Sequence, residues 1–204
     1  MEVDELLPYL RENREQLIQT IRDGKYHPNP VRRVEIPKEE KGKVRKLGIP
    51  TVVDRVIQQA ISQILSPIFE TQFSEYSYGF RPKRSAHDAI NQCQRNVNEG
   101  YKYVVDMDLE KFFDTVSQSK LIEVLSRTIK DGRVISLIHK YLRAGVVVRH
   151  KFEETEVGVP QGGPLSPLLS NIMLNELDKE LTARGHKFVR YADDSAPRRR
   201  VQVA

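Results

Sequence analysis

Two short apolar stretches in this chain each lead into aspartates. One carries Asp106 and Asp108, and the other, about eighty residues further on, ends in the adjacent pair Asp193 and Asp194. Carboxylate oxygens hold divalent cations such as Mg²⁺, and a pair of these ions can stabilise the attacking and leaving oxygens of phosphoryl transfer. An isolated Asp pair is more often a turn or a helix cap, so the assignment depends on the sequence around the two stretches.

Alternation along the first stretch puts Asp106 and Asp108 on one face of a strand, so it does not choose between them as ligands. A second constellation surrounds Gln161, where the loop 158–164 contains three glycines and two prolines. Glycines let a backbone approach a ligand closely, and prolines hold the loop rigid. Taken alone, this loop would be only a tight turn.

Composition indicates a soluble globular protein of one large or two small domains. The 204 residues are 39% hydrophobic and 30% charged, with a mean hydropathy of −0.52. We expect no membrane helix, because no apolar run approaches about 18 residues, and no signal peptide opens the chain. The single cysteine, Cys93, excludes an internal disulfide and suits a reducing cytoplasm.

Basic residues concentrate in one segment. Residues 25–46 contain eight basic and three acidic side chains, so this segment carries the whole net charge of +5. Such a segment is the electrostatic footprint expected for a polyanionic partner, although a solvated lysine-rich loop would look similar.

Periodicity and cap signals predict an alternation of helices and short strands. Helices are predicted at 3–23, after Thr51-x-x-Asp54 with an end or a kink at Pro67, after Ser85-x-x-Asp88, at 118–129, at 133–143 and at 166–183. Hairpins are predicted at 31–50 and 146–159, and single strands at 101–109 and 187–191.

With these pieces in place, the sequence resembles reverse transcriptases, specifically the bacterial group II intron-encoded maturases. Five blocks carry the resemblance in the family's order: LGIPTVVDR (47–55), SYGFRP (77–82), DLEKFFD (108–114), PQGGPLSPLLSN (160–171) and YADD (191–194). The first two blocks are the more particular to the intron branch.

The resemblance implies roles for individual residues. Asp108 and Asp193 would bind two Mg²⁺ ions, with support from Asp194 and the backbone carbonyl of Leu109, and Asp106 would be structural. The nucleotide-binding residues would be Lys38 and Arg45 at the triphosphate, Phe113 as the steric gate against a 2′-OH, and Gln161 in the pocket. We expect Arg32, Arg33, Lys41 and Lys43 to bind RNA.

The implied fold is α+β, the right-hand fold of reverse transcriptases, with a small antiparallel palm sheet packed on helices. Residues 1–30 would form an amino-terminal extension, 31–100 the fingers and 101–194 the palm. Residues 195–204 depart from the family pattern and are interpreted as a non-family tail or a truncation. The thumb of the family's fold is therefore expected to be absent from this chain. Pro197 should interrupt the strand expected to return there. If Asp108 and Asp193 bind the same metal ions, the strand before Asp108 should lie beside the strand ending at Tyr191.

The implied function is RNA-directed DNA synthesis in the bacterial cytoplasm, with group II intron RNA, an RNA template with a DNA primer, and dNTPs as partners. The resemblance leaves undecided whether the chain forms a homodimer. Two alternatives also remain: a retron, diversity-generating or CRISPR-associated reverse transcriptase, or an RNA-binding splicing cofactor without polymerase activity.

Overall fold

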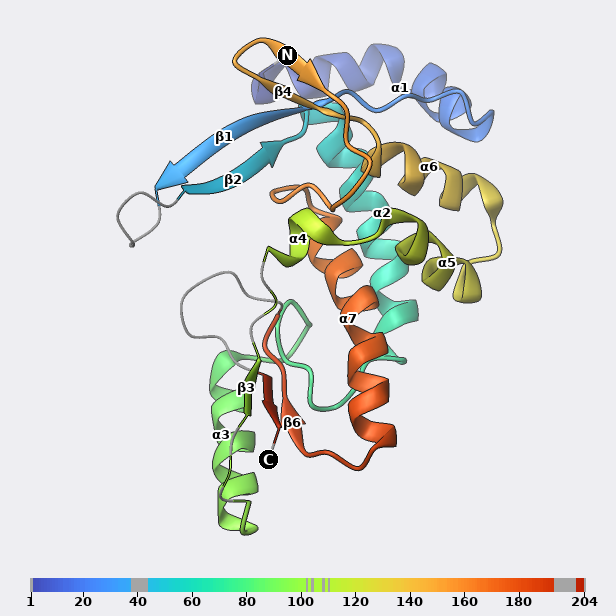
Figure 1. The fold of residues 1–204 in the computed structure, drawn as a ribbon. Helices are drawn as coiled ribbons and strands as arrows, with labels where there is room; N and C mark the ends of the chain where they lie inside the picture. The colour runs from blue at the N-terminus through green and yellow to red at the C-terminus, as the bar shows by residue number, and fades with distance from the viewer. Residues whose placement is uncertain are drawn as a thin grey trace. The chain divides into compact units, whose positions relative to one another are not determined.

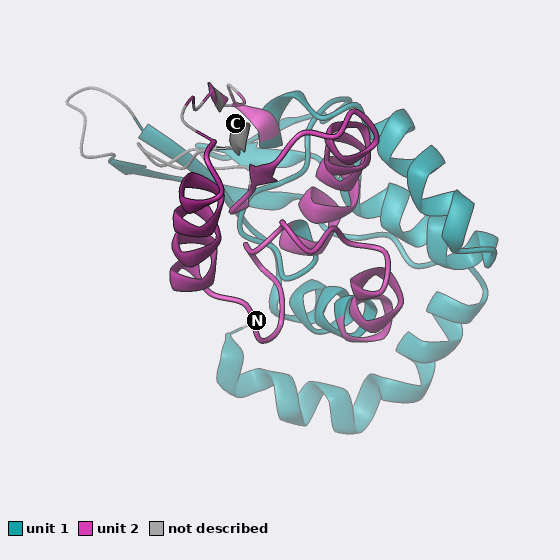
Figure 2. Cartoon of the chain, turned by 90° about the horizontal axis from the view of Figure 1, so that it is seen from below, with its two compact units in different colours: residues 1–62, 113–166 teal, residues 63–112, 167–204 magenta. Residues whose placement is uncertain are grey.

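The computed structural model describes residues 2–37, 44–101, 103, 105–107, 109, 111–192 and 201–203. The chain divides into two compact units, each built from two separate stretches (Figure 2). Unit 1 comprises residues 1–62 and 113–166, and unit 2 comprises residues 63–112 and 167–204. The predicted fingers (31–100) and palm (101–194) are each one continuous range, whereas each unit combines two stretches. The assignment of fingers and palm therefore stays a prediction.

Unit 1 begins with the predicted amino-terminal helix. A 3₁₀ turn, η1 (Val3–Glu5), leads into α1 (Leu6–Arg22). The helix ends at a turn in which Gly24 adopts φ +68°, a left-handed conformation that costs glycine little.

The sheet of unit 1 has four strands in the order β2-β1-β4-β5. They are β1 (Val31–Pro37), β2 (Val44–Ile49), β4 (Val146–Val148) and β5 (Lys151–Glu153). The antiparallel β1–β2 pair, prominent in Figure 1, confirms the first predicted hairpin, whose tip lies outside the described residues. The second hairpin is shorter than predicted, because the chain turns at Arg149 and His150, both at positive φ.

Helix α2 (Val52–Glu70) starts at the predicted cap. The Asp54 N–H donates to Thr51 Oγ1 at 3.3 Å, and the Thr51 hydroxyl donates to Asp54 Oδ2 at 2.5 Å. Of the two outcomes predicted at Pro67, an end or a kink, the end was wrong, and the kink stays a prediction. Proline removes one backbone hydrogen bond, but Leu65 and Phe69 on either side are buried, and their packing carries the helix to Glu70.

Two further helices of unit 1 match their predictions closely. They are α5 (Gln118–Thr128), capped by Ser117, and α6 (Gly132–Leu142), capped by Asp131. Both are amphipathic, and Leu121, Leu125 and Ile138 on their inner faces are fully buried. A one-turn helix, α4 (Phe112–Thr115), precedes them.

In unit 2, α3 (Ala86–Asn98) begins at the predicted capping box of Ser85 and Asp88, and α7 (Ser166–Ala183) supplies the long helix. Two small cores form here. One contains Tyr78, Ala89 and Val189, and the other contains Leu181 and Phe188. Within the ranges that the structure describes, none of the helices combines the length and apolar character needed to cross a membrane.

The sheet of unit 2 has the order β3-β7-β6. Its strands are β3 (Val105–Met107), β6 (Phe188–Val189) and β7 (Val201–Val203). The prediction that the strand before Asp108 lies beside the strand ending at Tyr191 was therefore wrong, because β7 pairs with both of them. Pro197 lies outside the described residues, and a returning strand forms from Val201 onward.

Candidate active site

The sheet of unit 2 brings together the two chain segments that lead to the predicted metal ligands. Since β3 and β6 both run antiparallel to β7, they are parallel to each other, and their carboxyl ends reach the same edge. Asp106 and Val189 pair with the same β7 residue, Gln202. Strands two places apart are separated by about 10 Å, a span that aspartate side chains can bridge through metal ions.

The predicted ligands Asp108, Asp193 and Asp194 lie outside the described residues, so their distances stay a prediction. Among the described residues, no group of three His, Cys, Asp or Glu side chains could hold a metal ion. The proposed fourth ligand, Leu109, is half-buried, and its carbonyl accepts a 3.3 Å hydrogen bond from the Phe112 N–H. A carbonyl oxygen has a second lone pair, so this bond leaves Leu109 able to bind a cation.

The segment before Asp193 is held in an unusual conformation. Ala192 is buried and has φ +55°, a left-handed conformation that non-glycine residues adopt rarely and at a cost. Gly79 lies directly against its backbone, so closely that a Cβ on Gly79 would overlap the Ala192 nitrogen. The turn into the aspartates is therefore tightly packed and specific in shape.

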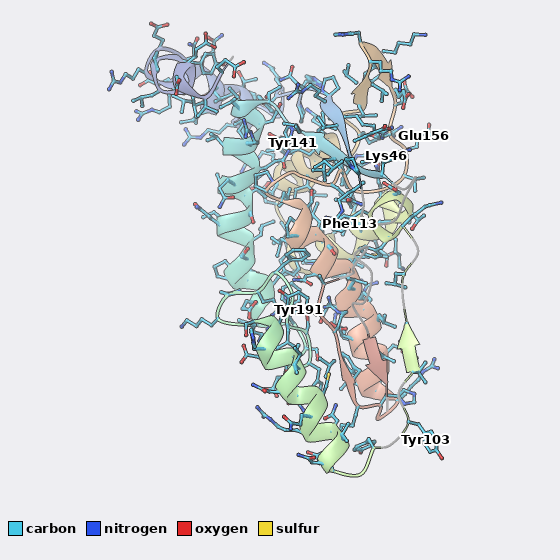
Figure 3. The ribbon with its side chains drawn as sticks, turned by 90° about the vertical axis from the view of Figure 1, so that its left-hand side faces the viewer. Lys46, Tyr103, Phe113, Tyr141, Glu156 and Tyr191 are labelled. Atoms are coloured by element: carbon cyan, nitrogen blue, oxygen red, sulfur yellow. The ribbon has the colours of Figure 1, made fainter. Side chains whose placement is uncertain are left out.

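Two of the predicted nucleotide-binding residues, Phe113 and Gln161, line one cavity of about 590 Å³ in unit 1. The loop 158–161 and strand β2 form much of its wall, together with the segment after β5. Figure 3 shows Lys46 and Glu156, two other lining residues, close to each other and above Phe113. Phe113 and Gln161 thus line the same cavity, and their contact with a nucleotide stays a prediction.

Backbone hydrogen bonds hold the Gln161 loop on both sides. The Gln161 carbonyl accepts from the Gly48 N–H at 2.6 Å, and the Val159 N–H donates to the Phe113 carbonyl at 2.7 Å. The buried side chain of Gln118 donates to the Gly158 carbonyl at 3.0 Å. The loop, β2 and α4 therefore form one rigid wall around the cavity.

The charges on this wall are mixed. Its cations are Arg33 and Lys46, and Arg33 is 3.5 Å from Glu153 in an ion pair. The carboxylates on the lining are Asp114, Glu153, Glu154 and Glu156. Carboxylates outnumber cations on this lining, so the cavity disfavours anionic groups such as phosphates.

Arg45, predicted at the triphosphate, does not line the cavity. It pairs with Ile36, whereas Lys46 pairs with Glu35, and neighbouring strand residues face opposite sides of a sheet. Arg45 therefore lies on the face away from Lys46. Our sequence reasoning missed Lys46 as a cavity residue, although alternation along 44–49 could have placed it on the face of Gly48.

The predicted RNA-binding residues are only partly described. Arg32 is exposed on β1, where it borders a second cavity of about 580 Å³ with Tyr26, Asn29 and Arg55. Arg33 is on the opposite face, in the ion pair with Glu153. Lys38, Lys41 and Lys43 lie outside the described residues.

Comparison with known protein families matches residues 36–196 to the reverse transcriptase (RNA-dependent DNA polymerase) family. The chain belongs to this family. The match covers every block singled out above, including the strand ends that lead to Asp108 and Asp193 and the loop that carries Gln161. The α+β fold of a reverse transcriptase is thereby confirmed.

Two curated relatives of this reverse transcriptase domain are named as intron proteins. It is 42% identical over 182 residues to the group II intron-encoded protein LtrA of Lactococcus lactis subsp. cremoris, covering 89% of this chain and 30% of that protein. It is 40% identical over 167 residues to a putative COX1/OXI3 intron 2 protein of Saccharomyces cerevisiae, covering 81% of this chain and 19% of that protein. The domain thus spans less than a third of these relatives.

Solved structures show the same fold. The reverse transcriptase domain aligns with a chain of a partial Cas6-RT-Cas1–Cas2 complex at a TM-score of 0.55 and 28% identity, covering 94% of this chain and 33% of that one. Among curated proteins, the domain is also 43% identical in sequence over 175 residues to protein YkfC of Escherichia coli K12, covering 82% of this chain and 46% of that protein.

Proposed function

We propose that this domain is the nucleotidyl-transfer part of a group II intron reverse transcriptase, which copies RNA into DNA in the bacterial cytoplasm. The observation that carries the proposal is the sheet of unit 2, where parallel strands β3 and β6 end at one edge and lead to Asp108 and Asp193. The identity of 42% to the Lactococcus intron protein supports the intron branch over the CRISPR-associated branch, where the identity is 28%.

The donor set suits magnesium. Asp108, Asp193 and Asp194 offer carboxylate oxygens and Leu109 a carbonyl oxygen, all hard ligands of the kind that Mg²⁺ prefers. Two such ions, when bound, polarise the α-phosphate and lower the pKa of the primer 3′-OH. Asp106, one residue before Met107 on the same strand, has a structural role in this proposal.

The chain's own residues orient the nucleotide. The Phe113 ring lies under the sugar and disfavours a 2′-OH, and the Gln161 amide binds beside it in the same cavity. Lys38 and Arg45 neutralise the β- and γ-phosphates outside the carboxylate-lined cavity, where Arg45 can donate two hydrogen bonds from its planar fork. The substrates are dNTPs on an RNA template with a DNA primer.

Single-nucleotide primer extension on an RNA template tests the metal assignment. Asp108→Asn and Asp193→Asn should each lower the rate at least about 100-fold, because several kcal/mol of transition-state stabilisation are lost. Asp106→Asn is the matched control on the same strand and should extend primers normally. Equal losses in all three variants would contradict the assignment.

The alternative, an RNA-binding splicing cofactor, is favoured by the exposed cation Arg32 and by the basic segment around it. Replacing Arg32, Arg33, Lys41 and Lys43 should weaken the affinity for intron RNA and flatten its salt dependence. Each lost phosphate contact removes roughly 0.7–0.9 from the log–log slope. RNA affinity without any primer extension, measured on one preparation, would favour the cofactor over the polymerase. An unchanged slope would place the RNA elsewhere.

A further inference from the structure

A fully buried arginine in unit 2 lies one residue before the YADD block. Arg190 is 1% exposed and forms an ion pair with Asp178 of α7, which is 0% exposed. Its Nε donates to Asp178 Oδ1 at 2.8 Å and its Nη2 donates to Asp178 Oδ2 at 2.6 Å. This two-pronged geometry is the strongest that arginine forms with a carboxylate.

The remaining N–H groups of Arg190 are also used. Nη2 donates to Ser77 Oγ at 2.7 Å, and Nη1 donates to Asn171 Oδ1 at 3.0 Å and to the Ala192 carbonyl at 3.5 Å. An arginine has five N–H donors, and each has an acceptor here. Lysine has three donors on a single nitrogen and could not reproduce this fork.

The backbone of the same residue is paired as well. The Arg190 N–H donates to the Tyr76 carbonyl and the Arg190 carbonyl accepts from the Tyr78 N–H, both at 2.8 Å. The segment 76–79 is thereby fixed along the strand end, and Asn171 Nδ2 donates to the Gly79 carbonyl at 2.8 Å.

These contacts converge on Ala192. The Arg190 guanidinium contacts its carbonyl, and Gly79, held by Asn171, packs against its nitrogen. Ala192 has φ +55°, a conformation that persists only where the surroundings impose it. Asp193 is the next residue in the sequence, so contacts that fix the backbone of Ala192 act directly before the YADD aspartates.

We propose that Arg190 is a positioning residue that sets the orientation of the Asp193 and Asp194 carboxylates by holding Ala192 in its left-handed conformation. This inference rests on the proposed metal-dependent function. Stability alone does not require the network, because a buried ion pair can often be replaced by apolar residues at no cost in stability. A variant can therefore keep its melting temperature and still lose the Ala192 conformation, and a test can measure the two properties separately.

The test compares variants of the 204-residue chain. Arg190→Met with Asp178→Leu removes both charges together and leaves an apolar pair. Arg190→Lys keeps a charge for Asp178 but loses the fork that reaches Asn171, Ser77 and Ala192. Three properties are measured in each variant: the melting temperature, the hydrogen-exchange rate of the Ala192 amide by NMR, and the affinity for Mn²⁺ by water-proton relaxation.

Arg81→Met is the matched control. Arg81 is likewise buried in unit 2, with a two-pronged ion pair to Glu70 and a contact to the Ser77 carbonyl, but it has no hydrogen bond to residues 190–192. We expect Arg81→Met to lower the melting temperature while Ala192 exchange and Mn²⁺ affinity stay at wild-type values.

For the double variant we expect a melting temperature close to wild type, with at least tenfold faster Ala192 exchange and at least tenfold weaker Mn²⁺ affinity. Arg190→Lys should show the same two losses, which keeps the proposal testable if the double variant does not fold. Wild-type exchange and Mn²⁺ affinity in both variants would overturn it. If the wild-type chain bound no Mn²⁺, the proposed metal site would fail, whereas the exchange rates would still decide whether Arg190 holds Ala192.

Discussion

The Gln161 carbonyl accepts a 2.6 Å hydrogen bond from the Gly48 N–H, which joins two residues that are 113 positions apart in the sequence. Gly48 belongs to the LGIP block and Gln161 to the PQGG block, so two motifs of the family meet through backbone atoms. On its other side the loop is bonded to the Phe113 carbonyl through Val159. Backbone hydrogen bonds therefore connect Phe113 and Gln161, two of the predicted nucleotide-binding residues.

Gly162→Ala should disturb these backbone hydrogen bonds. Gly162 has φ +111°, and a Cβ there would lie 2.8 Å from the Gly48 carbonyl oxygen. We expect a loss of about 1–3 kcal/mol in the free energy of unfolding, because both the backbone and the contact are strained. Gly132→Ala is the control, since nothing lies within 4 Å of its Cβ position. It should be neutral or stabilise by up to about 1 kcal/mol, and equal losses in the two variants would contradict the argument.

Arg45→Ala and Lys46→Ala compare neighbouring cations on opposite faces of β2. We expect Arg45→Ala to raise the KM for dNTPs about tenfold or more, because a charge-assisted contact to phosphate is lost. Lys46→Ala should have a smaller effect, because Lys46 faces the carboxylate-rich cavity. Steady-state single-nucleotide incorporation measures both values, and a larger effect at Lys46 would move the phosphates into the cavity.

Phe113→Val should lower the discrimination between deoxyribonucleotides and ribonucleotides. The smaller side chain leaves room for a 2′-OH, so the ratio of the two kcat/KM values should shift while deoxyribonucleotide incorporation stays near normal. Phe112→Val is the control one residue away. If Phe113 serves only as packing, its truncation should instead reduce stability, by up to about 3–5 kcal/mol for a fully buried Phe→Ala, together with all activity.

Unit 1 should lose stability as the pH rises past about 10. Burial, reinforced by a 2.7 Å hydrogen bond to Asp54, raises the pKa of Tyr26, and burial likewise raises the pKa of Tyr141. Above the ordinary tyrosine pKa of about 10, the unfolded chain loses protons that the folded chain keeps, so unfolding becomes more favourable. The slope is at most about 1.4 kcal/mol per pH unit for each tyrosine.

Urea unfolding at a series of alkaline pH values measures this slope. Tyr26→Phe should reduce it, because one of the two groups is removed. Tyr103→Phe, at an 87% exposed side chain, is the control and should leave the slope unchanged. A pH-independent stability up to pH 11 would show that neither hydroxyl is coupled to folding.

Local signals in the sequence predicted most helices well. The cap residues Ser85 and Asp88 do place the start of α3, and the glycine after α1 does mark its end. Pro67 does not end α2, one of the two outcomes predicted for it, because the packing of Leu65 and Phe69 outweighs the lost backbone bond. The single strands predicted at 101–109 and 187–191 are longer than β3 and β6, since strand length depends on the partner strand and not only on the segment's own residues.

The sequence alone determined the family, the order of the elements and the residue types of the candidate site, because motif spacing and side-chain periodicity are local properties. Only the tertiary structure decided that β7 lies between β3 and β6, that Lys46 and not Arg45 faces the cavity, and that Arg190 is held by Ser77, Asn171 and Asp178. These contacts join residues as far as 113 positions apart. They can stabilise the fold only after the intervening chain has closed into loops, so no local pattern in the sequence predicts them.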